Sequence, residues 1–489
     1  METLTTKEVN SLVEKKKRDL VRVFVKGGII SPGDFHKIIN TASNLGAEHI
    51  HFGSRQDILF PVNDRNKPAL DETFKSINTE YEINKFVHQN IVCSYVALDV
   101  MPNKKWLVPH VYHYILDSFE YRPKLRINIV DPSQSLVPLF TGNINFIASS
   151  VENYWYVHLR FDKSSAFPKA LPFLIYGYDI AKLAKAVEDL HLLSAEMKID
   201  EISETLLNEV KINIHSCSEE LRFPVTHFPY YEGINRKSDG KYWLGLYWRN
   251  NSFTIPFLKE LCKRCIDTNI GKISLTPWKS FVIKGIQESD RVGWEKFMGS
   301  NGMNLRHSAL ELNWHLPVLD EEAMELKNYL VRALDQQDIS TSGLTFTIKT
   351  SEDMILFTSV VVERNISRNG SFNTYNILYS KDFNPNLSEY FYYAKNITKE
   401  VIPPLLMELS LKYYEQLEEE PIPTVEHTEE KAKKEQLLYQ CINCMTIYDQ
   451  AYGDSNANIE AGVAFADLPA DYTCSLCGSK KESFNVVGK

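Results

Sequence analysis

Two C-x-x-C pairs near the C-terminus constrain this chain more than any other feature of its sequence. Four of its eight cysteines fall within the last 49 residues, in the runs QCINCM and TCSLCG. Two such pairs, separated by part of a domain, are typical of a tetrahedral four-thiolate metal site. Each turn presents two sulfurs and several backbone N–H groups that stabilise the thiolates. The sequence therefore predicts that Cys441, Cys444, Cys474 and Cys477 bind one metal ion.

The identity of the metal is not fixed by the ligands, because zinc and iron both accept four thiolates in a tetrahedron. The segment between the pairs, residues 445–473, is longer than the roughly 15–20 residues usual for a zinc ribbon of this pattern. The spacing therefore argues against an ordinary zinc ribbon, while zinc itself stays open.

The segment that contains both pairs resembles rubredoxin, over nearly all of residues 437–489. The run YQCINCMTIYDQAYGD resembles the first metal-binding turn of that family, and FADLPADYTCSLCG resembles the second. The resemblance implies one iron in a site of four cysteines, which carries one electron at a time without substrate chemistry. It also places five aromatic residues in the core of the module: Tyr439, Tyr448, Phe465, Tyr472 and Phe484.

Three residues depart from the rubredoxin pattern. Met445 stands where the family usually has glycine, Ser475 replaces the usual proline, and Tyr472 replaces the usual tryptophan. Glycine suits this turn because it tolerates positive φ. Met445 is thus either a tolerated substitution, or an exposed apolar contact for a redox partner, or a source of an unusual iron potential. None of the three removes a ligand.

The first 414 residues contain an internal repeat. Residues 26–62 align without a gap with residues 249–285 at an offset of 223, and apolar positions face apolar positions. Each copy has the pattern of a strand, a Ser or Thr helix N-cap, a helix, and two strands joined by a tight turn. Ser31 followed by Pro32 is the expected order at a helix N-terminus. The pattern predicts a duplicated α+β unit.

Both copies resemble the ferredoxin-like half domains of the siroheme nitrite and sulfite reductases. The resemblance rests on GSRQDIL (53–59), which matches a Thr-x-Arg-Gln segment of that family, and on LTPWKSFVI (275–283) in the second copy. It implies an α+β fold, with a duplicated nitrite/sulfite-reductase-like body followed by the small rubredoxin-type four-cysteine domain. The expected domains are 1–210 (first half), 211–414 (second half), 415–436 (acidic linker) and 437–489 (rubredoxin-like module).

The body lacks the two short-spaced cysteine groups that hold a 4Fe–4S cluster in the siroheme reductases. Its own cysteines are Cys93, Cys217, Cys262 and Cys265, and residues 121–161 contain none. Because a cubane cluster requires thiolates, no 4Fe–4S cluster and no six-electron reduction are expected. The C-x-x-C of Cys262 and Cys265 falls in the middle of an expected helix, and we interpret it as two structural thiols.

A pocket for siroheme must be basic, because siroheme carries many carboxylates. Arg55 matches the arginine of the Thr-x-Arg-Gln segment, and Lys279 follows the equivalent turn of the second copy. These two are the candidates for binding siroheme or an anion, although Arg55 is equally a fold contact. Lys26, Lys124 and Arg126 lie in segments that could face the same cleft. No catalytic residue is assigned.

Composition excludes several function classes. The net charge of −9 argues against sequence-independent nucleic-acid binding. The chain has no apolar run long enough to span a membrane, and its N-terminus is polar. A cytoplasmic protein without a membrane span is therefore expected. Apolar spacing predicts helices near 3–20, 179–210, 320–336 and 401–418.

The favoured hypothesis is a one-electron carrier with a mononuclear iron centre, whose body docks a redox partner, possibly a nitrite or sulfite reductase. The first alternative is an oxidoreductase in which the body binds siroheme or an anion and is supplied with electrons by its own iron module. In this hypothesis siroheme is possible but is not the favoured ligand. The second alternative is a structural zinc module.

Overall fold

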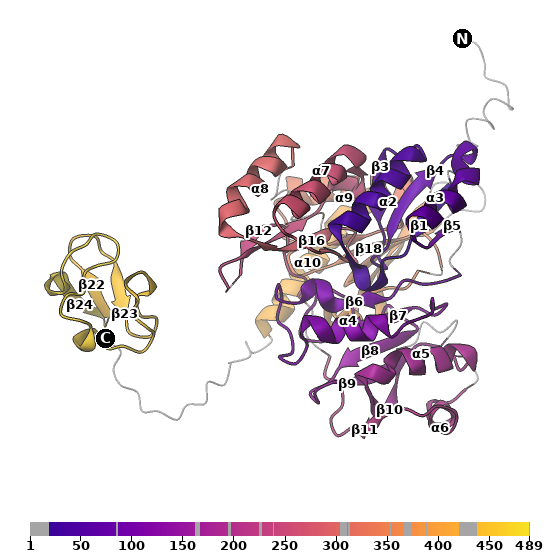
Figure 1. The fold of residues 1–489 in the computed structure, drawn as a ribbon, viewed down its shortest axis with the longest axis horizontal. Coiled ribbons are helices and arrows are strands. Elements are labelled where there is room, and N and C mark those ends of the chain that lie inside the picture. The colour runs from indigo at the N-terminus through magenta and orange to yellow at the C-terminus, as the bar shows by residue number, and fades with distance from the viewer. Residues whose placement is uncertain are drawn as a thin grey trace, which may run out of the picture. The chain divides into compact units, whose positions relative to one another are not determined.

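The computed structural model describes residues 19–84, 87–161, 167–193, 197–223, 227–237, 239–303, 311, 313–352, 354–365, 373–387, 389–419 and 438–488. The chain divides into two compact units, residues 1–417 and 418–489, here called the body and the module. Each has a hydrophobic core of its own. Figure 1 shows the helices and strands of both units.

The predicted internal repeat is confirmed in the body. Helices α2 (Pro32–Asn44) and α7 (Ile255–Asp267) begin and end 223 residues apart, the offset of the sequence repeat. The Ser31 side chain accepts a hydrogen bond from the Asp34 N–H at the start of α2, which satisfies one of the free amides of the first turn. The strands that follow the two helices also correspond: β3 (His49–Phe52) and β4 (Ile58–Val62), then β15 (Ile273–Leu275) and β16 (Phe281–Ile286).

The two copies exchange an edge strand. In the first sheet, of order β14-β3-β4-β1-β5, Phe253 of the second copy lies opposite Ile50. In the second sheet, of order β12-β13-β16-β15-β2, Ile30 of the first copy lies opposite Ile273. Each five-stranded sheet is therefore completed by the other copy. The remaining strands of these sheets are β1 (Asp19–Val23), β2 (Ile29–Ile30), β5 (Tyr81–Ile83), β12 (Gly233–Arg236), β13 (Tyr242–Leu246) and β14 (Phe253–Thr254).

One core serves both copies. Helices α2 and α7 lie side by side over the two sheets (Figure 1). Between them the rings of Phe52, Phe253 and Phe281 have centroids 5.1, 5.6 and 5.4 Å apart, and all three are fully buried. Replacing one buried phenylalanine by alanine costs about 3–5 kcal/mol in such a core, so this cluster ties the copies together.

Each half of the body also contains a mixed sheet, of six strands in the first half and five in the second, and the two have the same order of parallel and antiparallel pairs. In the first, of order β11-β10-β9-β8-β7-β6, the pairs β6–β7 and β7–β8 are parallel and the rest antiparallel. The second, β17-β18-β19-β20-β21, begins with two parallel pairs and continues with two antiparallel pairs. The duplication therefore extends beyond the aligned segments. The strands are β6 (Val92–Cys93), β7 (Ile127–Val130), β8 (Ile144–Ala148), β9 (Tyr154–Leu159), β10 (Lys169–Tyr176), β11 (Ile214–Ser216), β17 (Trp314–His315), β18 (Phe346–Lys349), β19 (Val360–Asn365), β20 (Thr374–Ser380) and β21 (Tyr390–Ile397).

The helix predictions are confirmed in part. The last two expected helices correspond to α9 (Glu321–Gln336) and α10 (Ile402–Glu419), and the region 179–210 forms two helices, α5 (Ile180–Asp189) and α6 (Ile199–Glu209). Residues 3–18 lie outside the described part, and residues 19–20 belong to β1. The expected linker starts inside α10, and residues 420–436 lie outside the described part. The other helices are α3 (Leu70–Ser76), α4 (Pro109–Asp117) and α8 (Glu288–Ser300).

The module is a three-stranded antiparallel sheet of order β23-β22-β24, with β22 (Leu438–Cys441), β23 (Ile447–Asp449) and β24 (Phe484–Gly488). Among the helices described in the chain, none has the length and apolar character needed to cross a membrane.

The side chain of a buried asparagine in the second copy hydrogen-bonds to the backbone of the first copy. The Asn251 side-chain amide donates to the Phe52 carbonyl at 2.8 Å and accepts from the Phe52 N–H at 2.9 Å. We expect Asn251→Ala to lower the free energy of unfolding by about 2–4 kcal/mol, because two buried backbone groups lose their partners. Urea denaturation followed by tryptophan fluorescence measures this change.

Asn269→Ala is the matched control. Asn269 also has positive φ (57° against 50° for Asn251) but is exposed, so its replacement changes only the cost of the left-handed backbone, about 1 kcal/mol. Equal destabilisation by the two variants would contradict a bridging role for Asn251.

Candidate metal centre

The four predicted cysteine ligands lie together in the module. Their sulfurs are all within 4.8 Å of one another, with 3.7 Å between Cys441 and Cys477 and 3.5 Å between Cys444 and Cys474. Metal–sulfur bonds of about 2.3 Å in a tetrahedron require sulfurs about 3.8 Å apart. The sulfurs are therefore arranged for one tetrahedral ion, as the sequence predicts. Cys441 and Cys474 are buried, Cys444 is half-buried and Cys477 is exposed.

The two ligand turns have the same hydrogen bonds. The Cys441 N–H donates to the Thr446 carbonyl at 2.8 Å, and the Cys474 N–H donates to the Ser479 carbonyl at 2.7 Å. This internal equivalence explains how a short local sequence positions both sulfurs of each pair.

Met445 and Gly478 occupy the equivalent left-handed position in the two turns. Their φ angles are 62° and 71°, and their N–H groups donate to the carbonyls of Cys441 and Cys474. A side chain at this backbone conformation costs about 1–2 kcal/mol relative to glycine. Met445 is 66% exposed, so its side chain extends into solvent and the turn keeps its shape.

Each turn places a hydroxyl group against a sulfur. The Thr446 hydroxyl lies 3.2 Å from the Cys444 sulfur, and the Ser479 hydroxyl lies 3.0 Å from the Cys477 sulfur. These hydroxyls, with the N–H groups of the same residues, lower the pKa of Cys444 and Cys477. Burial instead raises the pKa of Cys474 to about 11. Backbone N–H groups of Asn443 and Cys444 also lower the pKa of Cys441, so Cys474 is the one ligand of the four whose pKa is raised.

The other two departures from the rubredoxin pattern meet at one carboxyl group. The Tyr472 hydroxyl donates to Asp454 at 2.8 Å. Burial raises the pKa of Asp454, whereas hydrogen bonds from the hydroxyls of Tyr472 and Ser475 lower it. The net effect is a lowered pKa for this carboxyl group. Tyr472 and Ser475 thus both act on one carboxyl group, and a proline side chain at position 475 would have no hydroxyl to do so.

The five expected aromatic residues form the core of the module. The rings of Tyr439 and Phe465 stack with centroids 4.0 Å apart, and Phe465 also contacts Tyr448, Tyr472 and Phe484. The Tyr448 hydroxyl donates to the carbonyl of Val463 at 2.7 Å. The aromatic core lies beneath the ligand turns, since Cys441 and Cys474 are part of the same hydrophobic cluster.

The body has a cavity of about 470 Å³ whose wall is rich in basic groups, here called the cationic cavity. Its charged lining residues are Arg22, Arg55, Asp57, Arg126 and Lys279. They come from β1, from the turn between β3 and β4, from the start of β7 and from the turn between β15 and β16. Arg22 is paired with Glu82 at 2.8 Å and lies 3.8 Å from Asp57, so the excess positive charge of the wall comes from Arg55, Arg126 and Lys279. Such a wall favours anions over cations.

Arg55 and Lys279, the predicted pair, both line this cavity but differ in their contacts. The Arg55 guanidinium donates to the Asn128 side chain and to the carbonyls of Asn90 and Ile127, at 2.7–2.8 Å. Lys279 is 7% exposed, has a φ of 58° and makes no hydrogen bond among the described residues. Arg55 is thus largely committed to the fold, whereas Lys279 has its ammonium group available to a ligand.

Among the other basic candidates, the structure brings only Arg126 to the described wall of the cavity. Lys26 donates to the Phe119 carbonyl at 2.9 Å, and neither Lys26 nor Lys124 is part of the described lining. Sequence analysis missed Arg22 and His315, which do line it. A signal for Arg22 was its position as a charged residue within the apolar run LVRVFV. For His315 no local pattern distinguishes it.

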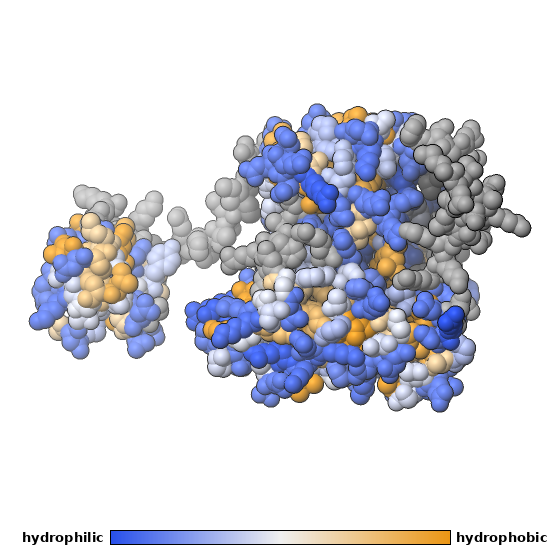
Figure 2. Space-filling model, turned by 90° about the horizontal axis from the view of Figure 1, so that it is seen from above, coloured by the Kyte–Doolittle hydropathy of each residue, from blue (hydrophilic) through white to orange (hydrophobic). Residues whose placement is uncertain are grey.

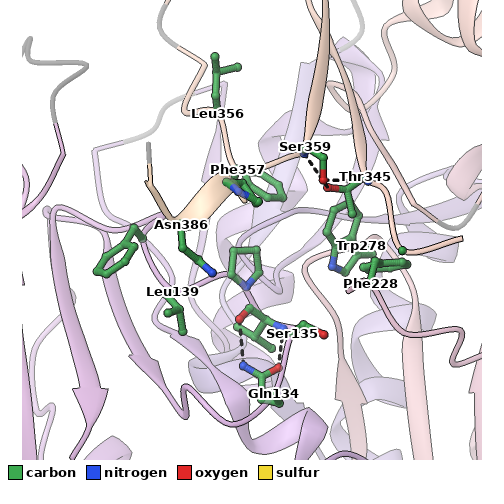
Figure 3. A pocket seen from close by; sticks show the side chains of 15 residues that line it. Gln134, Ser135, Leu139, Phe228, Trp278, Thr345, Leu356, Phe357, Ser359 and Asn386 are labelled. Atoms are coloured by element: carbon green, nitrogen blue, oxygen red, sulfur yellow. Dashed lines mark hydrogen bonds between the residues drawn. The ribbon is translucent and has the colours of Figure 1, made fainter. Parts of the chain in front are cut away.

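A second, smaller cavity of about 30 Å³ lies beside the first and is shown in Figure 3. Phe357 borders both cavities. Its described lining has no charged side chain, and polar groups such as Thr345 and Ser359 hydrogen-bond to each other at 3.2 Å. Of these two cavities, the cationic one is therefore the one that suits an anion.

The body's own C-x-x-C pair consists of two buried thiols in one helix. Cys262 and Cys265 lie buried in α7, and burial raises the pKa of both thiols. Within the described residues, the only cluster of ligand atoms suited to a metal ion is that of the module. The interpretation of these two cysteines as structural thiols agrees with their burial.

A buried lysine without a hydrogen-bond partner among the described residues makes stability depend on pH. Burial, together with the charge of Lys327, lowers the pKa of Lys279 from 10.5 to about 7. We expect Lys279→Met to stabilise the body by on the order of 2 kcal/mol at pH 7. The gain should shrink as the pH rises from 7 to 10.5, because the folded state sheds this proton before the unfolded state does. Urea denaturation of both proteins at several pH values measures the difference, and a gain independent of pH would contradict it.

The family model of rubredoxin matches residues 438–484. This chain is 52% identical to rubredoxin of Megasphaera elsdenii over 46 residues, 9% of this chain and 86% of that protein. It is 44% identical to rubredoxin-2 of Desulfovibrio desulfuricans over 45 residues, 9% of this chain and 73% of that protein. It is 34% identical to the high molecular weight rubredoxin of Moorella thermoacetica over 85 residues, 16% of this chain, and so spans only 37% of that protein's length.

One solved structure has a fold similar to that of most of this chain. The NirA protein of Mycobacterium tuberculosis has a TM-score of 0.63 with 13% identity, and the match covers 81% of both chains. This similarity is one of fold, and it confirms the predicted nitrite/sulfite-reductase-like body in front of a four-cysteine module. Through that C-terminal module, with its four ligands, its two ligand turns and its aromatic core, the chain belongs to the rubredoxin family.

Proposed function

We propose that the chain is a one-electron transfer protein whose redox centre is a single iron bound by Cys441, Cys444, Cys474 and Cys477. The observation that carries this proposal is the near-tetrahedral set of sulfurs. The Cys444 and Cys474 sulfurs are 3.5 Å apart, and the Cys441 and Cys477 sulfurs are 3.7 Å apart. Iron bound there supplies a one-electron Fe(III)/Fe(II) couple. The protein contributes a fixed four-thiolate cage and donors that stabilise negative charge on sulfur.

The surface of the module supports electron exchange with another protein. Cys477 is exposed, and Ile442, Met445 and Leu476 beside the ligands are 57%, 66% and 72% exposed. Figure 2 shows apolar side chains gathered on the visible face of the module. Small, transient interfaces suit electron-transfer partners, and we propose a redox protein, such as a nitrite or sulfite reductase, that the body docks.

The cationic cavity supports the alternative of a siroheme- or anion-binding oxidoreductase. Lys279, with its available ammonium group, and Arg126 in the wall suit the carboxylates of siroheme. The described lining contains no cysteine, so it offers a 4Fe–4S cluster no thiolate. In this alternative the residues named bind and orient an anionic group, and siroheme would supply the reducing iron.

The first experiment is a visible spectrum with metal analysis of the full chain, purified without oxygen after iron supplementation. We expect one iron per chain and a red colour that bleaches with dithionite, because thiolate-to-iron charge transfer requires Fe(III). A tetrapyrrole band would favour the alternative. Stoichiometric zinc that iron reconstitution fails to replace would contradict electron transfer and support the structural zinc module.

Electron delivery is tested with the reduced protein and a stoichiometric amount of a nitrite or sulfite reductase. We expect the red colour of the oxidised centre to return faster than in a mixture with an unrelated acidic protein. An equal rate with both would reject these enzymes as partners.

The two hydroxyl groups near the sulfurs should set the reduction potential. Thr446→Val and Ser479→Ala each remove a hydrogen-bond donor. Such a donor stabilises the reduced centre more than the oxidised one, because the reduced centre is more negatively charged. We expect each to lower the potential by on the order of tens of millivolts, measured by spectroelectrochemistry. Thr473→Val is the control, since Thr473 is exposed and makes no hydrogen bond to a ligand sulfur among the described contacts. A similar shift in all three would rule out a specific effect.

A further inference from the structure

One polar group of the cationic cavity is used neither by the fold nor by the function proposed above. His315 lies at the end of β17, lines the cavity and is 7% exposed. Its Nδ1 atom is buried without a hydrogen-bond partner among the described residues, and its ring contacts Phe357, with centroids 4.6 Å apart. Buried imidazoles are normally hydrogen-bonded. Because the Nδ1 atom is itself buried, a ligand in the cavity would have to reach the Nε2 atom of this ring.

The state of this imidazole suits a metal rather than an anion. Burial, with the nearby charge of Lys279, lowers the pKa of His315 well below its usual value. A neutral imidazole has a free lone pair, which makes histidine a common ligand of iron. A neutral ring offers an anion one N–H hydrogen bond but no charge, whereas Lys279 and Arg126 are residues of the wall that supply positive charge.

The rest of the cavity lining indicates what kind of molecule would carry such a metal. Apolar side chains occupy a large part of the wall: Leu20, Leu59, Leu316, Val318, Met354, Ile355 and Phe357. A volume of about 470 Å³ lies in the range of about 300–1,000 Å³ typical of organic ligand sites, far above what a small oxyanion needs. The wall thus combines a metal ligand, an apolar surface and cations for carboxylates.

We propose that His315 would bind the iron of a tetrapyrrole held in the cationic cavity, and that Lys279 and Arg126 would bind its carboxylates. This inference rests on the siroheme alternative of the proposed function and names the residue that would hold the iron in a wall that has no cysteine among its described residues. It is a binding site and requires no change of oxidation state.

The test is a titration of the full chain with siroheme, and in parallel with haemin, followed by difference absorption in the Soret region. We expect tight binding and a Soret band typical of imidazole coordination. His315→Ala should weaken binding by at least about tenfold and shift the band, and added imidazole should restore the wild-type spectrum. Lys279→Met should weaken binding without shifting the band, because it removes charge and no ligand.

His158→Ala is the matched control. His158 on β9 is also buried (3% exposed), with an Nδ1 atom that has no partner among the described residues, but it is not part of the described cavity lining. It should bind as the wild type does. If His315→Ala does not fold by circular dichroism, His315→Gln takes its place.

An unchanged Soret band in the His315 variants, or binding of sulfite or nitrite with no binding of either tetrapyrrole, would overturn the proposal. The iron content of the module is measured separately on the same samples. A failure of the electron-carrier proposal is therefore distinguishable from a failure of this one.

Discussion

The body depends on the exchange of edge strands between its two copies. The sheet β14-β3-β4-β1-β5 needs β14 from the second copy, and the sheet β12-β13-β16-β15-β2 needs β2 from the first copy. Each exchanged strand has only two residues, so its backbone pairing is weak alone and relies on the shared phenylalanine core beneath it. The two repeats therefore fold as one unit, and the turns that follow β3 and β15 are fixed relative to each other.

Those two turns bring their own contacts between the copies. Gln56, in the first, donates to the Leu275 carbonyl at 2.7 Å and to the Cys93 carbonyl at 3.1 Å, and it accepts from the Cys93 N–H. Lys279, at the equivalent position 223 residues later, lies in the wall of the cationic cavity. The cavity is thus a product of the duplication: its residues come from both copies, and the strand exchange determines where they meet.

The sequence predicted best what is encoded locally. The four ligand cysteines follow from two short turns, and the boundaries of α2 and α7 follow from the repeat offset. The strand exchange was not predictable, because the apolar alternation around Phe253 and Ile30 indicates which face is buried and not which strand lies next to it.

The cavity was predicted only in part for the same reason. Arg55 and Lys279 were found because they lie in the repeated segment, whereas Arg22 and His315 come from strands far apart in the chain. Contacts across the fold decide whether a buried polar residue is a packing residue or part of a site.

The pairing of Gln56 with Lys279 has one more consequence. Both have a φ of 58°, so the duplicated scaffold offers two nearly identical backbone positions related by its internal symmetry. Only Lys279 carries a charge, and other equivalent positions differ in charge as well: Arg55 corresponds to Trp278, and Asp57 corresponds to Ser280. If the wall were symmetric, an elongated ligand could bind in either of two orientations with equal energy. Because each of these charged residues comes from only one of the two copies, the two ends of such a ligand would meet different electrostatic environments.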